Sequence, residues 1–135
     1  MGFDLTPDRA AEALAAARAL IARLRREGRH HVACTVLTER AAYTACNLET
    51  VLPRASICAE AVAVGMAAVA EPLAPILLSV AVNRRGEVLP PCGPCRELLL
   101  DYGSGAMVVV AEADGAPVLR PIRALMPDPY KAHLR

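Results

Sequence analysis

The stretch CAEAVAVG at residues 58–65 and the stretch PCGPC at residues 91–95 decide how the rest of this chain is interpreted. Each stretch places a cysteine at the expected start of a helix. The N-terminus of a helix has free N–H groups and a partial positive charge, both of which lower the pKa of a thiol. The two stretches therefore predict that Cys58, Cys92 and Cys95 supply three thiolates from two helix starts.

Outward from these stretches, strand-like and helix-like segments alternate along the chain. Expected helices cover residues 7–27, 58–70 and 93–102, expected strands cover residues 32–37, 41–46, 76–82 and 107–111, and a short last helix starts at residue 121. Thr6 and Pro7 predict the cap and first turn of the first helix, and Gly28 ends it near Glu27. This alternation predicts an α/β fold whose sheet is covered on both faces.

Composition narrows the class of protein. A chain of 135 residues predicts one domain, spanning residues 1–135. Its 55% hydrophobic content predicts a packed core, with some apolar surface buried between subunits. A net charge of +1 and only 3% aromatic residues argue against binding of a nucleic acid polymer, which needs a basic groove with stacking rings.

The start of the chain and its cysteines predict a cellular compartment. No run reaches the roughly 18 apolar residues of a membrane span, and Met1 to Thr6 lacks the pattern of a signal peptide. We therefore expect a cytoplasmic protein with no membrane contact. Thiols stay reduced there, so the five cysteines indicate metal ligands, a redox pair or core residues instead of disulfides.

Three thiolates suit Zn²⁺ and leave its fourth position open to water, which is what distinguishes a catalytic zinc site from a structural one. Zinc lowers the pKa of that water to about 7. Glu60 lies two residues after Cys58 and is not needed as a ligand. It is therefore the candidate catalytic residue, able to shuttle protons between the water and a leaving group.

The spacing of both motifs matches the three-cysteine variant of the zinc nucleoside and nucleobase deaminase pattern. Over residues 30–130 the chain resembles the cytidine deaminase family in its small homotetrameric form, and also its relative blasticidin S deaminase. The resemblance implies a three-layer α/β/α sandwich with a mixed five-stranded sheet, bound Zn²⁺ and a homotetramer. It also implies hydrolytic deamination of a small nucleoside-like substrate, with cytidine or deoxycytidine as the first expectation and blasticidin S or another aminated heterocycle as the alternative.

Further site residues follow from the same resemblance. Asn47 and Glu49 match the family's Asn-x-Glu, whose side chains hold the ribose hydroxyls. The backbone of Ala59 is expected to hold the amide edge of the ring. Tyr130 matches an aromatic position near the substrate, and His30 stands where the family usually has a Phe that packs on the pyrimidine.

The sequence departs from the family at positions that bear on the substrate. His30 adds a polar edge where a Phe is usual, and Ala61 replaces an Arg that often follows the catalytic Glu. The helix ends, with Arg96 or Arg54, are the candidates to balance the negative charge of three thiolates and one zinc. Ala61 favours the blasticidin S relative, whereas Glu49 favours cytidine, so the two substrates remain open at this point.

Other classes of protein would explain parts of the cysteine pattern. Cys92 to Cys95 spell the thioredoxin tetrapeptide, although Pro91 replaces the usual Trp and Cys58 stays unexplained. A structural zinc module would take Cys34 or Cys46 as its fourth ligand. The cysteines could also be buried core residues, with Glu60 stabilising a helix start.

The expected substrate-binding residues also have structural alternatives. Asn47 and Glu49 fit a turn and a strand end. His30 and His31 fit structural or pocket-lining roles, and Tyr130 fits a half-buried ring in the C-terminal tail.

Overall fold

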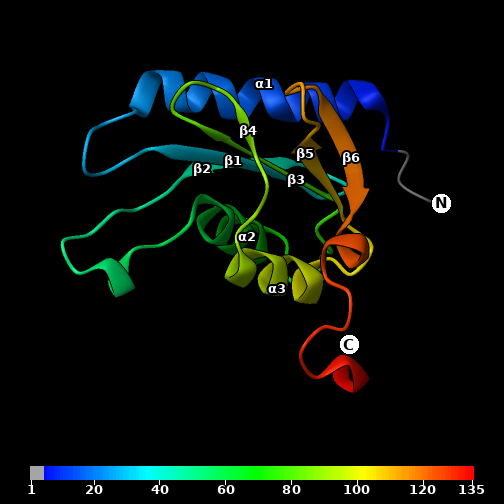
Figure 1. The fold of residues 1–135 in the computed structure, drawn as a ribbon. Coiled ribbons are helices and arrows are strands. Elements are labelled where there is room, and N and C mark those ends of the chain that lie inside the picture. Colours follow the sequence, from blue (N-terminus) through cyan, green and yellow to red (C-terminus); the bar gives the residue numbers. More distant parts are fainter. Residues whose placement is uncertain (1–4) are drawn as a thin grey trace.

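The computed structural model describes residues 5–135 and consists of a mixed sheet between two layers of helices (Figure 1). The strands are β1 (Val32–Leu37), β2 (Ala42–Cys46), β3 (Leu78–Asn83), β4 (Val88–Leu89), β5 (Met107–Ala111) and β6 (Pro117–Pro121). The α-helices are α1 (Pro7–Leu24), α2 (Ala59–Ala70) and α3 (Gly93–Tyr102), and short 3-10 helices are η1 (Pro53–Ala55), η2 (Ile122–Leu125) and η3 (Ala132–Leu134). Helix α1 covers one face of the sheet, and α2 with α3 covers the other. The expected α/β/α sandwich is confirmed.

The strands follow the order β2-β1-β3-β5-β6, with the short β4 paired to β3. Strand β1 is antiparallel to both β2 and β3, β3 is parallel to β5, and β5 is antiparallel to β6. The expected mixed five-stranded sheet is therefore present, and β4 adds a sixth, two-residue strand. Sequence reasoning assigned neither β4 nor β6. Strand β6 begins and ends with proline, which is tolerated because it lies at the edge of the sheet.

Two hydrophobic cores lie on the two faces of the sheet. Leu78, Val80 and Val82 of β3 pack against α1. Cys34 and Val36 of β1 face the opposite way, toward α2 and α3. Alternate residues of each central strand thus serve different layers, which explains why these strands are apolar without a polar face. Both faces of the sheet are therefore buried against helices.

The sequence predicted the start of α1 correctly and its end incorrectly. Thr6 caps the start of the helix by accepting a hydrogen bond from the N–H of Arg9 at 3.3 Å, as expected. The predicted end near Glu27 is wrong, because the helix stops at Leu24. The chain turns instead at Gly28, whose φ of +73° favours glycine, and Arg26 pairs with His30 across this turn.

Helix α2 is tied to the β1–β2 hairpin at its C-terminal end. The carboxylate of Glu71, the C-cap residue, accepts hydrogen bonds from the hydroxyls of Thr38 and Tyr43. These bonds lower the pKa of Glu71. They join the C-terminal end of α2 to the hairpin on which the helix packs.

Within residues 5–135, no helix combines the length and apolar character needed to cross a membrane. Residues 1–4 lie outside the described part of the chain, and with them most of the segment on which the signal-peptide expectation depends.

A close approach at the end of α3 makes Gly103 a sensitive position. A Cβ atom at Gly103 would lie 2.2 Å from the backbone carbonyl oxygen of Ile76, in the segment that leads into β3. Gly103→Ala should therefore lower the free energy of unfolding by about 3 kcal/mol, measured by urea denaturation of the zinc-saturated protein. Gly105→Ala is the matched control, because nothing lies within 4 Å of its Cβ position. Equal stability of the two variants would contradict this account.

Candidate metal centre

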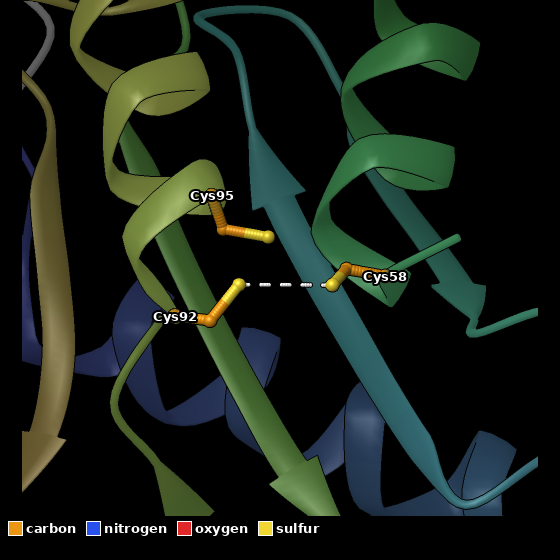
Figure 2. A group of neighbouring side chains, drawn as sticks. All are labelled: Cys58, Cys92 and Cys95. Atoms are coloured by element: carbon orange, nitrogen blue, oxygen red, sulfur yellow. Dashed lines mark hydrogen bonds between the residues drawn. The ribbon is translucent and has the colours of Figure 1, made fainter. Parts of the chain in front are cut away.

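Three cysteine side chains converge between the starts of α2 and α3 (Figure 2). The Sγ atoms of Cys58 and Cys92 are 3.7 Å apart, and all three sulfur atoms lie within 4.8 Å of one another. All three cysteines are free thiols. Two thiolates on one tetrahedral zinc, each at about 2.3 Å, stand about 3.8 Å apart. The sulfur spacing therefore fits a shared zinc ion.

The local sequence explains why the sulfur atoms meet. Cys58 and Cys92 are the N-cap residues of α2 and α3, and neither helix start is capped by a side-chain hydrogen bond. Cys95 lies one turn further along α3, so it projects from the same end of that helix as Cys92. The free N–H groups and the dipoles of two helix starts thus point toward the sulfur cluster and favour negative charge there.

Arg96 holds the loop that leads into α3. Its Nε donates to the carbonyl of Pro91 at 2.9 Å, and its Nη1 donates to the carbonyl of Leu125 at 3.1 Å. The guanidinium therefore joins the residue before Cys92 to η2 near the C-terminus. The other candidate for charge balance, Arg54, lies exposed in η1.

Glu60 is a buried carboxylate beside the cluster. Only 6% of its surface is exposed, and its Oε2 lies 3.5 Å from the Sγ of Cys95. It occupies the second position of α2, in the turn that begins at Cys58. The carboxylate thus contacts the cluster without being part of the three-sulfur group.

The electrostatics of the cluster call for a cation. Burial raises the pKa of the Cys95 thiol, and the negative charge of Glu60 raises it further. Burial also raises the pKa of Cys58, and contact with Cys92 adds to the shift. The hydrogen bond from Cys95 offsets part of the shift at Cys58. A bound divalent ion would deprotonate coordinating thiols outright. The donor set, three soft sulfur ligands with no fourth side chain, fits zinc with one open position.

The remaining cysteines lie outside the cluster. The described residues contain one group of three or more side chains with metal-ligand geometry, and it consists of Cys58, Cys92 and Cys95. Cys34 is buried in the core, and its Sγ lies 3.5 Å from the hydroxyl of Ser79. Cys46 lies 3.4 Å from Nδ1 of His30. Neither supplies a fourth ligand, so a closed structural zinc site is not formed.

The segment expected to bind a sugar lies next to the cysteines. Leu48 and Ile57 form an antiparallel bridge with two backbone hydrogen bonds of 2.9 Å, and Ile57 directly precedes Cys58. Asn47 and Glu49 flank Leu48. The side-chain oxygen of Asn47 accepts hydrogen bonds from the N–H groups of residues 31 and 32, at 2.7 and 3.0 Å. Asn47 therefore has the structural role that the sequence left open as an alternative, and its expected role in sugar binding stays a prediction.

The remaining expected substrate-binding residues lie in three different places. His30 is half-buried, and its Nδ1 lies 2.8 Å from the carbonyl of Asn47. Ala59 is fully buried at the first position of α2. Tyr130 is 71% exposed, with its ring centre 5.4 Å from Nζ of Lys131. The structure thus groups His30 with Asn47 and Ala59 with the cysteines, and leaves Tyr130 on the surface of the single chain.

One neighbour of this segment was not assigned to the site from the sequence. The imidazole of His31 lies 3.0 Å from the carboxylate of Glu49. The register of the β1–β2 hairpin was the available signal. This register pairs Ala33 with Cys46. Extending the antiparallel pairing by two residues beyond the strands places His31 opposite Leu48.

Comparisons with known proteins agree with this geometry. A family model described as the cytidine and deoxycytidylate deaminase zinc-binding region matches residues 7–111. A protein named blasticidin-S deaminase from Bacillus cereus is 32% identical over 123 residues, covering 82% of this chain and 84% of that protein. A cytidine deaminase structure from Mycobacterium tuberculosis is 25% identical with a TM-score of 0.76, covering 90% of this chain and 96% of that one. A cytidine deaminase structure from Bacillus anthracis has a TM-score of 0.78 at 21% identity, covering 92% and 91%.

Loss of one sulfur ligand should remove the metal. We expect the purified protein to carry about one zinc ion per chain, and Cys95→Ser to carry a small fraction of that, measured by elemental analysis. The same variant should unfold at a lower urea concentration, because metal binding and folding share free energy. Cys46→Ser, a thiol outside the cluster, should retain its zinc. Full zinc content in Cys95→Ser would contradict the assignment.

Proposed function

Because this chain belongs to the cytidine and deoxycytidylate deaminase family of zinc-binding hydrolases, we propose that its substrate is cytidine or deoxycytidine. The proposed reaction replaces the ring's amino group with a carbonyl and releases ammonia. The observation that carries the proposal is the position of Glu60. Its buried carboxylate contacts the sulfur cluster, and the Asn47–Glu49 segment is bridged to the residue just before that cluster.

The three cysteines would hold the zinc ion. Bound zinc supplies a water molecule whose pKa is lowered to about 7, so that hydroxide is available near neutral pH. Cys58 and Cys92 provide ligands from the exposed side, and Cys95 provides one from the buried side. The three sulfur atoms would thus leave one coordination position of the ion to water.

Glu60 moves the protons. Its carboxylate accepts a proton from the attacking water and gives it to the ring nitrogen beside the carbon that bears the amine. It then carries the second proton of that water to the amine, which leaves as ammonia. Burial of Glu60 excludes bulk water from these transfers.

The rest of the site orients the substrate. Ala59 presents backbone groups at the start of α2, where they can hold the amide edge of the ring. His30 offers an imidazole face to the ring, with its Nδ1 engaged by the carbonyl of Asn47. Asn47 and Glu49 offer an amide and a carboxylate to the sugar hydroxyls. Together they select a pyrimidine that carries a sugar.

Blasticidin S is the second candidate substrate. The 32% identical relative bears that activity in its name. Ala61 in place of Arg points the same way, because the blasticidin S relative also lacks that arginine. Glu49, in contrast, favours cytidine.

We further propose a cytoplasmic homotetramer. Large apolar side chains stay exposed on the single chain, among them Val51 and Leu52 near η1 and Val69 and Leu73 at the end of α2. Association of subunits would bury them. The exposed Tyr130 would then meet the substrate at a subunit boundary. A reducing compartment keeps the three ligand thiols available to zinc.

Substitution of Glu60 should separate chemistry from metal binding. Glu60→Gln keeps the size of the side chain but cannot accept a proton, so we expect kcat to fall by about 10²- to 10⁴-fold with zinc content unchanged. Ammonia release and elemental analysis measure the two quantities. Glu12→Gln, on the exposed face of α1, is the matched control. Substantial activity in Glu60→Gln would remove Glu60 from the mechanism.

A substrate panel tests the proposed function directly. Ammonia release is measured with cytidine, deoxycytidine, free cytosine, adenosine and blasticidin S. We expect the highest kcat/KM with cytidine or deoxycytidine, and a value at least about tenfold lower with cytosine, which cannot use Asn47 and Glu49. Turnover of blasticidin S with none of cytidine would reverse the order of the two candidates.

A further inference from the structure

His31 and Glu49 form a pair at the sugar end of the proposed site. Nε2 of His31 lies 3.0 Å from Oε2 of Glu49, with 24% and 46% of the two side chains exposed. The pair lines a cavity of about 580 Å³, whose wall also includes Val32, Asn83 and Arg84. The carboxylate is thus reachable from solvent, and its position is set by the imidazole.

The backbone of His31 is fixed as well. Its N–H donates to the side-chain oxygen of Asn47 at 2.7 Å, and that oxygen also accepts from Val32. Within the described chain, no hydrogen-bond partner is seen for the amide nitrogen of Asn47 or for Oε1 of Glu49. One donor and one acceptor therefore remain beside His31. A hydroxyl group, which both accepts and donates, matches that combination.

Nε2 of His31 has two neighbours. The N–H of Gly28 donates to it at 3.1 Å, and Oε2 of Glu49 lies 3.0 Å from it. One ring nitrogen cannot accept from Gly28 and donate to Glu49 at the same time. Because a carboxylate only accepts, the inference requires the form of the ring in which Nε2 donates to Glu49 in place of accepting from Gly28.

We infer that His31 is a positioning residue, which holds Oε2 of Glu49 so that Oε1 binds a sugar hydroxyl of the substrate. The inference rests on the proposed function and extends it. It makes the His31–Glu49 pair the part of the site that selects substrates with a free hydroxyl on the sugar ring, while Glu60 and the cysteines serve the amine.

The test compares His31 variants on two substrates that differ only at the sugar. Cytidine has hydroxyls at the 2′ and 3′ positions of the sugar ring, and 2′,3′-dideoxycytidine lacks both. We expect His31→Phe to raise KM for cytidine about tenfold with kcat within about twofold, and to leave KM for the dideoxy substrate unchanged. His31→Gln keeps an N–H donor and should restore most of the affinity for cytidine. His133→Phe and His133→Gln, in the exposed η3, are the matched controls.

A double-mutant cycle tests whether His31 acts through Glu49. Adding His31→Phe to Glu49→Gln should cost cytidine no further affinity, because the partner is already changed. Zinc content and the thermal midpoint are measured for each variant. If His31→Phe fails to fold, His31→Gln and Glu49→Gln complete the comparison, with His31→Gln expected to retain cytidine affinity and Glu49→Gln to lose it.

The outcomes separate this inference from the proposed function. Absence of cytidine and deoxycytidine turnover by the unmodified protein overturns the proposed function, and the inference with it. Cytidine turnover with equal losses on both sugars in His31→Phe overturns the inference alone. So do additive effects of the His31 and Glu49 substitutions, or a His31→Gln variant no better than His31→Phe.

Discussion

The approach of three thiols to one point is the constraint on which this structure depends. Sulfur atoms within 4.8 Å of one another, beside a buried carboxylate, disfavour their own ionisation. A bound cation that accepts soft ligands would offset the repulsion among the ionised thiols. The fold supplies the remaining conditions, because the sheet carries α2 and α3 side by side and directs both helix starts to the same place. The Glu71 contacts join the other end of α2 to the β1–β2 hairpin, and the Arg96 contacts hold the loop before α3.

The same geometry separates the acid from the ligands. Glu60 lies in the first turn of α2, close enough to contact the cluster through Cys95, yet the three sulfur atoms already supply the protein's share of a tetrahedral site. A carboxylate that is held near the metal without coordinating it can accept and return protons. The spacing of Glu60 from Cys58 therefore matters as much as the identity of either residue.

The sequence predicted the cluster of three cysteines better than the edges of the fold. Cys58, Cys92 and Cys95 could be found because their spacing at helix starts is local information, and the buried strands could be found from their apolar runs. The end of α1 was misplaced because the Gly28 turn depends on pairing between Arg26 and His30, which no local pattern reports. Strand β6 was missed because its prolines indicate a loop unless the strand lies at an edge. The role proposed for His31 depends on hairpin register, a property of two segments together.

The site divides between two parts of the fold. The metal ligands and Glu60 lie at the starts of α2 and α3, whereas His30, His31, Asn47 and Glu49 lie where the open end of the β1–β2 hairpin continues past its strands. The Leu48–Ile57 bridge joins the two parts. Proteins named for cytidine and for blasticidin S are both similar to this chain. In the proposed function, the chemistry at the amine and the recognition of the sugar depend on different elements, so one scaffold can carry both activities.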